Sequence, residues 1–300
     1  MTGLGALLKR NVKLYFKDKG MFFTSLITPL ILLVLYATFL WNVYEDSFRS
    51  ALKAAGATLN DSVIKGCVGG QLIASLLAVC CVTVAFCSNL MMVQDKVSGA
   101  RRDLTVTPVK NATLSLGYFL SALFSTLIIC GITAVAGLIY LRFVGWYLSA
   151  LDVLLLLLDV LLLSLFGTAL SSCVLFKLST SGQASAVGTI VSAGYGFICG
   201  AYMPISSFSE NLQHVISLLP GTYGTSLLRN HALRGVFSEM EAVHFPKEVV
   251  SAIRDSVDCN LYFWGDKVSG AAMYAILIGS ILVLTGLFVL LNRISSKNGK

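Results

Sequence analysis

The chain has 300 residues, of which 56% are hydrophobic and only 12% are charged, and its mean hydropathy is +0.81. Soluble domains carry roughly a quarter charged residues, so this composition excludes an ordinary soluble domain and a disordered chain. The net charge of +7 would suggest nucleic-acid binding in a soluble protein. Here most of the chain must face lipid, and the positions of the charges matter more than their sum. We expect no nucleic-acid partner.

Residues 1–20 predict an amphipathic helix on the inner leaflet. Apolar side chains recur at helical spacing from Leu4 to Tyr15, which favours a helix. The basic complement is supplied by Lys9, Arg10, Lys13 and Lys17. The alternative is a basic leader that only sets the topology.

Six stretches are long and apolar enough to span a bilayer, which takes about 20 residues. They are residues 21–44, 66–93, 112–141, 153–176, 184–203 and 268–292. The only charge in any of them is Asp159. We therefore predict an all-α integral membrane protein with a six-span domain over residues 21–292 and a tail over residues 293–300.

The distribution of charge predicts the orientation. An even number of spans places both termini on one side, and the short segments on that side hold most of the Lys and Arg residues. By the positive-inside rule both termini are cytoplasmic. The three tryptophans, Trp41, Trp146 and Trp264, then lie at outer ends of spans, where amphipathic rings favour the headgroup level.

The longest cytoplasmic loop, residues 94–111, reads QDKVSGARRDLTVTPVKN. It predicts a short charged helix that stops at Thr107-Pro108. Such a helix between two spans needs a protein partner or a headgroup surface. The alternative is a plain solvated connector.

The fifth expected span carries a small residue at every fourth position: Ala184, Gly188, Ser192, Gly196 and Gly200. Such a stripe lets another helix approach closely in lipid. The contact predicted by this stripe is either between helices of one chain or between two chains.

The segment over residues 204–266 lies on the outer side in this topology. After Pro204, Leu212 and Ile216 mark an apolar half-helix that Pro220 closes. A second short stretch over residues 222–233 would complete an element that dips into the membrane and returns. Residues 236–266 read as polar, with one short helix after Pro246.

Several kinds of chemistry have no support in the sequence. No Gly-rich loop ends in Lys-Ser or Lys-Thr, so we expect no ATP hydrolysis by this chain. The three histidines show no metal-ligand spacing, and we predict neither a metal site nor a cofactor. Asp159 is read as a structural group paired with a hydroxyl or with Arg142, or as a proton or substrate site. Cys67 and Cys259 are open to a disulfide, but we expect free thiols.

The order of elements resembles the permease subunits of type 2 ATP-binding-cassette (ABC) exporters. The most specific similarities lie in residues 95–109, an acidic start followed by Gly, Leu and Thr-Pro-Val, and in residues 203–229, with LQHVISLLPGTY at the centre. The chain departs from the family pattern at Asp95 and at Arg102-Asp103, and the stretch 236–266 is longer than in many relatives.

The resemblance implies a function and a set of partners. Residues 1–20 would form a connecting helix, and Leu212–Leu219 would form the re-entrant helix near the outer exit. The coupling helix that docks on a separate ATPase would comprise Asp95, Lys96, Ser98, Gly99, Arg101, Arg102, Asp103 and Pro108. ATP and Mg²⁺ would bind on that ATPase, and a second permease copy or a paralogue would complete the transporter.

We therefore expect an exporter in a bacterial cytoplasmic membrane that moves a lipid-like, glycan-linked or drug-like molecule outward. The rival hypothesis is an ion- or proton-coupled secondary transporter or channel centred on Asp159. It predicts internal symmetry between halves, and the sequence shows none.

Overall fold

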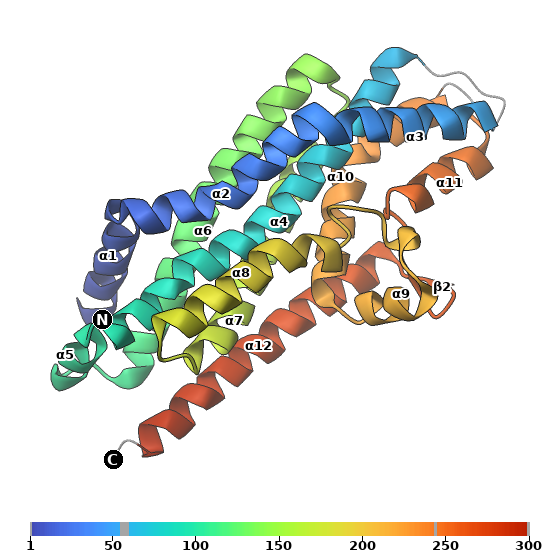
Figure 1. Ribbon diagram of the computed structural model, residues 1–300. Helices are drawn as coiled ribbons and strands as arrows, with labels where there is room; N and C mark the ends of the chain where they lie inside the picture. Colours follow the sequence, from blue (N-terminus) through green and yellow to red (C-terminus); the bar gives the residue numbers. More distant parts are fainter. Residues whose placement is uncertain (1, 55–59, 243–244, 299–300) are drawn as a thin grey trace.

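The structure is a computed structural model that describes residues 2–54, 60–242 and 245–298. These residues are almost entirely helical (Figure 1). In chain order the elements are α1 (Thr2–Lys17), α2 (Lys19–Leu35), the π-helix η1 (Tyr36–Leu40), α3 (Trp41–Ala54), α4 (Asp61–Val97), α5 (Ala100–Val106), α6 (Asn111–Val144), α7 (Ala150–Phe176), α8 (Ser181–Ile198), the 3₁₀ turn η2 (Ile205–Ser207), α9 (Glu210–Ser217), α10 (Pro220–Ala242), α11 (Lys247–Ser256), β1 (Tyr262–Phe263), β2 (Asp266–Lys267) and α12 (Gly270–Asn298).

Five helices in the described part of the chain are long and apolar enough to cross a membrane. They cover residues 19–50, 61–97, 111–144, 150–176 and 270–295. Four of them contain an expected span completely, and α12 contains the expected span 268–292 except for its first two residues. The all-α membrane fold is therefore confirmed. The first span is one continuous helical run, α2, η1 and α3, which contains Pro29 and a π-turn.

The fifth expected span, residues 184–203, is not among these five helices. Its helix α8 has 18 residues and ends at Ile198, and its Gly, Ser and Gln content lowers its hydropathy. α8 nevertheless packs on α4 and lies beside α2 and α7 in the bundle (Figure 1). Its role as a span stays a prediction.

α4 is the central helix of the bundle. It contacts α2, α6, α7, α8 and α10, and nearly all of its residues are buried. Small residues make this close packing feasible. A Cβ atom at Gly70 would lie 2.7 Å from Leu233 of α10, so only glycine fits there without displacing that neighbour.

α1 runs beside the first half of α6 in matching register. Leu7 of α1 packs on Gly117 of α6, and Asn11 donates a 3.3 Å hydrogen bond to Ser121 one turn further along. Leu7, Asn11 and Tyr15 form the buried face of α1, while Lys9, Lys13 and Lys17 are exposed. The expected amphipathic helix is present, and its buried face packs on α6.

The outer segment corrects two expectations. The apolar half-helix is present as α9, but the second stretch is not short: α10 has 23 residues and extends to Ala242. Its continuation is buried because Leu233, Val236, Phe237 and Met240 keep helical spacing on one side. The stretch from Val236 is therefore not uniformly polar. The expected short helix after Pro246 is α11, and a two-stranded antiparallel hairpin, β1 and β2, was not expected.

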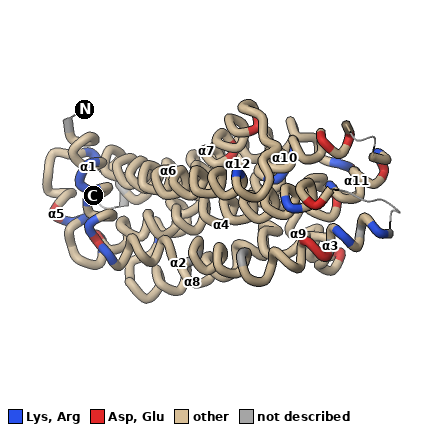
Figure 2. The backbone as a smooth tube through the Cα atoms, turned by 90° about the horizontal axis from the view of Figure 1, so that it is seen from above, with Lys and Arg blue, Asp and Glu red and all other residues tan. Residues whose placement is uncertain are grey.

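Charge separates the molecule into two ends and a middle. Figure 2 shows most Lys, Arg, Asp and Glu residues toward the two ends of the bundle, with a largely uncharged band between them. Both termini, α1 and α5 lie at one end, while α3, α9 and α11 lie at the other (Figures 1 and 2). This arrangement is what an even number of crossings requires.

Candidate functional site

A groove between α2 and α8 has a volume of about 850 Å³. Its lining is mainly apolar and includes Ile27, Ile31 and Leu35 of α2 and Ala184 and Gly188 of α8. The α2 residues are about half exposed. A volume of several hundred cubic ångströms and an apolar lining are typical of ligand sites.

The small-residue stripe divides between two environments. Ala184, Gly188 and Ser192 line the groove, and a Cβ atom at Gly188 would meet no atom within 4 Å. At Gly196, in contrast, a Cβ atom would collide with the ring of Tyr202. Among the described residues the first part of the stripe therefore faces open space, and Gly196 makes a close contact within its own segment.

The end of the groove nearest α3 is bounded by the turn that follows α8. Tyr36, Leu40, Tyr202 and Met203 line this end, and the Tyr36 hydroxyl donates a 3.5 Å hydrogen bond to the carbonyl of Ala201. The turn passes through Gly200, whose φ of +74° lies in the left-handed region that favours glycine.

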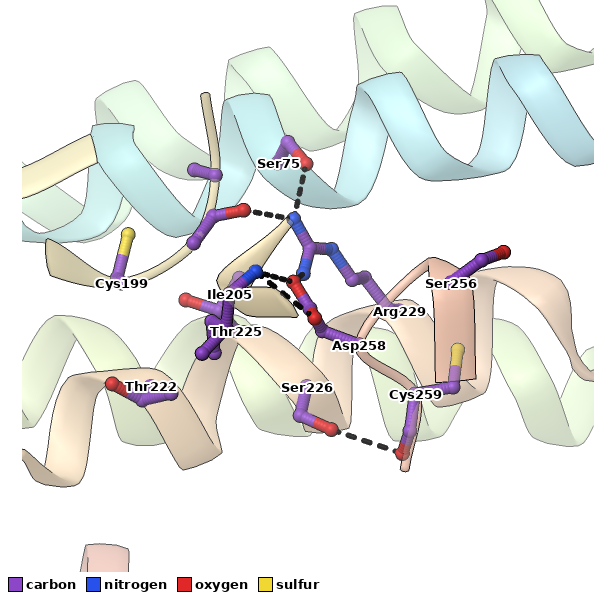
Figure 3. Close-up of polar contacts among 12 residues, drawn as sticks. Ser75, Cys199, Ile205, Thr222, Thr225, Ser226, Arg229, Ser256, Asp258 and Cys259 are labelled. Carbon is purple, nitrogen blue, oxygen red and sulfur yellow. Dashed lines mark hydrogen bonds and ion pairs between the residues drawn. The ribbon is translucent and has the colours of Figure 1, made fainter. Parts of the chain in front are cut away.

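A buried ion pair holds this turn in place (Figure 3). Arg229 of α10 donates to the Asp258 carboxylate over 2.9 Å, to the Ser75 hydroxyl over 3.2 Å, and to the carbonyl of Gly200. Asp258 also accepts from the backbone N–H of Ile205, 3.1 Å from each carboxylate oxygen. Arg229 and Asp258 are both almost fully buried. One charged pair thus connects α4, α10, the turn after α8 and the loop after α11.

The electrostatics of Asp258 reflect this burial. Burial raises the pKa of the Asp258 carboxyl, while the Arg229 guanidinium and the Ile205 amide act in the opposite direction. An unpaired charge in such a place costs several kcal/mol, roughly 3–5 when one partner is removed. The pair therefore depends on both of its members.

Asp159 of α7 lies in a second buried polar cluster. One carboxylate oxygen lies 2.5 Å from Nδ1 of His231, and the other accepts a 2.7 Å hydrogen bond from the hydroxyl of Tyr274. About two turns toward the start of the helix, Asp152 caps α7 together with Ser149, and its carboxylate lies 3.5 Å from the guanidinium of Arg234. Asp159 therefore pairs with a hydroxyl, as one reading expected, and His231 is an additional partner.

At the end of the bundle that holds the termini, Arg10 connects α1 to α4. It donates to both carboxylate oxygens of Asp95, over 2.6 and 3.1 Å, and Tyr118 of α6 donates to Asp95 over 2.6 Å. Asp95 is buried, and its hydrogen bonds raise the pKa of Arg10. Arg10 of the expected connecting helix thus contacts Asp95 of the expected coupling helix.

Lys96 and Arg101 contact the end of α7. Lys96 donates to the backbone carbonyls of Phe176 and Leu178, the second over 2.9 Å, as cations commonly do at helix C-termini. The guanidinium of Arg101 lies 5.8 Å from the centre of the Phe176 ring. Lys96 thus joins the end of α4 to the end of α7, and Arg101 of α5 lies against the same end of α7.

The remaining residues expected in the coupling helix are more accessible. Ser98, Arg102, Asp103 and Pro108 are exposed, and Gly99 precedes α5 with a φ of +84°. Val106, at the end of α5, is 84% exposed. α5 therefore presents an exposed face of mixed charge and apolar character.

Sequence reasoning missed Arg229, Asp258 and His231. Arg229 lies in the outer stretch 222–233, which was expected to dip into the membrane, and Asp258 lies in the stretch 236–266, which was expected to be polar and where a charge is unremarkable. The signal that was available is the helical spacing of apolar residues along α10, which places Arg229 on a buried face. All eight cysteines are free thiols, and Cys67 and Cys259 are both buried.

Comparison with known proteins agrees with this architecture. A bundle of long apolar helices with a short charged helix between the second and third of them defines a multi-pass membrane protein. The family model for ABC-2 type transporters matches residues 2–232, and the chain belongs to this family. No match was found among curated proteins. The chain is thus the membrane component of an ABC-type transporter and not its ATPase; permeases of this family work with an ABC ATPase partner.

Proposed function

We propose that the chain is the permease of an exporter, and that its groove between α2 and α8 carries an amphipathic molecule outward. The single observation that supports this proposal most is the groove itself, which has an apolar lining and open space at Gly188. Such a surface suits a lipid-like, glycan-linked or drug-like substrate, because apolar contacts bind without a fixed geometry.

The Arg229–Asp258 pair would hold the groove closed at one end. It fixes the backbone at Gly200 and Ile205, beside the tyrosines that line that end of the groove. Outward release then requires this turn to move, and the cost of separating a buried ion pair would keep the path shut at rest.

ATP and Mg²⁺ would act on a partner ATPase that docks at α5. The exposed residues Arg102, Asp103 and Pro108 suit such a contact. The links from Arg10 to Asp95 and from Lys96 to the end of α7 would pass the movement of α5 and α1 into the spans. A second permease copy or a paralogue would close the open side of the groove.

We infer that α5 and both termini lie in the cytoplasm of a bacterial cell, with α9, α11 and the hairpin outside. The basic residues around α1 and α5 support this orientation under the positive-inside rule. A carrier driven through Asp159 gains no support, because both of its carboxylate oxygens already have partners.

Filling the groove tests the proposal. Gly188→Trp places a large ring in the groove and should leave the fold of the chain intact, because a Cβ atom at Gly188 meets no atom within 4 Å. In proteoliposomes that hold the complete transporter, we expect it to abolish the increase in ATP hydrolysis that lipid extract from the source membrane causes. Gly194→Trp is the matched control, since Gly194 lies on the same helix, also meets no atom within 4 Å and does not line the groove. Equal stimulation of the Gly188→Trp transporter and the unmodified one would reject the groove as the path.

A further inference from the structure

A second groove lies between α1 and α6, with a volume of about 500 Å³. It is lined on the α1 side by Lys9, Val12, Lys13 and Phe16, and on the α6 side by Phe124. It therefore combines two ammonium groups with an apolar floor.

The basic residues of α1 have separate surroundings. Arg10 turns toward the bundle and pairs with Asp95. Lys9 and Lys13 are exposed and line the groove, and no ion pair joins either lysine to a carboxylate in the described residues. The groove therefore carries two positive charges that nothing in this part of the chain neutralises.

The two lysines are spaced for a single anionic group. Residues four apart on a helix face have Cβ atoms about 5–6 Å apart, and two ammonium groups at that spacing can both donate to the oxygens of one phosphate. Lys9 and Lys13 stand in this relation.

The depth of the groove matches the boundary between headgroups and hydrocarbon. Trp41 packs edge-on against Tyr140, with ring centres 6.5 Å apart, which marks the outer level of the membrane. A helix crosses the hydrocarbon in about 20 residues. The inner boundary of the hydrocarbon is therefore near Met21 on the first span, counted from Trp41, and just before Ser121 on α6, counted from Tyr140. Phe124 then lies just inside the hydrocarbon. By the Leu7–Gly117 and Asn11–Ser121 contacts, Lys9 lies about one turn nearer the headgroups than Lys13, whose long side chain reaches them from the depth of Phe124.

The apolar part of the groove continues into the lipid-facing surface. Phe124 is 51% exposed, and Phe16 is half-buried beside it. An acyl chain that leaves the headgroup would run along these rings.

We propose that the groove between α1 and α6 binds one anionic phospholipid, with its phosphate on Lys9 and Lys13 and an acyl chain on Phe16 and Phe124. The proposal rests on the membrane topology of the proposed function but on none of its transport steps. A bound lipid would fix α1 against α6 by contacts separate from the Arg10–Asp95 pair.

Native mass spectrometry of the purified full chain tests the proposal without an activity assay. The probes are phosphatidylglycerol, which is anionic, and phosphatidylcholine, which is zwitterionic. We expect the unmodified chain to retain one molecule of phosphatidylglycerol, with an at least fivefold preference over phosphatidylcholine. The Lys9→Gln/Lys13→Gln variant should lose this preference, and Lys9→Arg/Lys13→Arg should keep it.

The matched control is Lys110→Gln/Lys177→Gln, which removes the same charge from two exposed lysines at the same end of the bundle. It should retain the lipid as the unmodified chain does. Phe124→Ala tests the acyl contact and should weaken retention of phosphatidylglycerol with no change in charge. Equal loss in both double-Gln variants, or no loss in the Lys9/Lys13 variant while the protein stays folded by size-exclusion chromatography, would overturn the proposal.

Discussion

The pairing of Arg229 with Asp258 shows how one residue can fix several segments at once. Arg229 is 1% exposed and contacts α4, the turn after α8 and the loop after α11. A buried guanidinium is tolerated only where its charge is compensated and its N–H groups have acceptors. The ion pair therefore forms only when these three segments are in place together, and the position of each segment depends on the ion pair.

Removal of Arg229 should be strongly destabilising. Arg229→Met leaves the Asp258 carboxylate without its cation, and the expected loss in unfolding free energy is about 3–5 kcal/mol. Thermal unfolding in detergent measures the change. In Arg229→Met/Asp258→Asn no charge remains buried, so this variant should recover much of the loss, and Asn suits the positive φ of +52° at position 258. A double variant less stable than the single one would contradict this account.

At the scale of elements, the position of α1 is set by two kinds of contact. Its buried face packs on small residues of α6, and Arg10 links it to the end of α4. Arg101 of α5 lies over the Phe176 ring at the end of α7, and Lys96, near the end of α4, donates to the backbone of the same end. The two short helices at the end of the bundle that holds the termini thus contact separate spans through specific side chains.

Loss of the Arg10 contact should loosen α1. Arg10→Leu removes two hydrogen bonds to a carboxylate. Because Arg10 is partly exposed, we take the low end of the range for charged hydrogen bonds, a loss of about 1.5 kcal/mol. The expected result is roughly tenfold faster hydrogen exchange in residues 2–17. Lys17→Leu removes an exposed charge from the same helix and should leave exchange unchanged. Unchanged exchange in Arg10→Leu would show that packing on α6 alone holds the helix.

The two parts of the α8 stripe should respond differently to a larger side chain. Gly196→Leu collides with the Tyr202 ring, and overpacking of this kind costs about 1–3 kcal/mol. Gly188→Leu meets open space and should be tolerated in the isolated chain. Unfolding temperature compares the two variants directly. A larger loss at Gly188 than at Gly196 would show that the groove is narrower than described.

Much of the fold follows from hydropathy alone, because a long apolar helix depends only on its own residues. α4, α6 and α7 lie where the sequence places them, and α1 and α5 were expected from amphipathic and charged patterns. The partners of charged residues were not predictable. Arg10 and Asp95 are 85 positions apart in sequence, and nothing local indicates that they meet. Asp159 was singled out as the only charge in a span, yet its contact with His231 depends on how α10 packs against α7.

At the scale of the whole molecule, the charges at both ends and the apolar band between them define one membrane-spanning body (Figure 2). The groove between α2 and α8 opens on the side of this body, and α5 stands at the end that holds both termini. An ABC-2 permease arranged in this way needs an energy source outside its own chain. The central claim is therefore that α5 couples the groove to a partner ATPase.

Purification of the tagged chain from its native membrane, in mild detergent and with an assay of ATP hydrolysis, tests this claim most directly. We predict that a P-loop ATPase co-purifies in stoichiometric amount and hydrolyses ATP. The Arg102→Glu/Asp103→Lys variant, which reverses two exposed charges of α5, should keep its fold and lose that partner. A pure chain that lacks an ATPase in several detergents, or a variant that retains the partner with undiminished hydrolysis, would contradict the account.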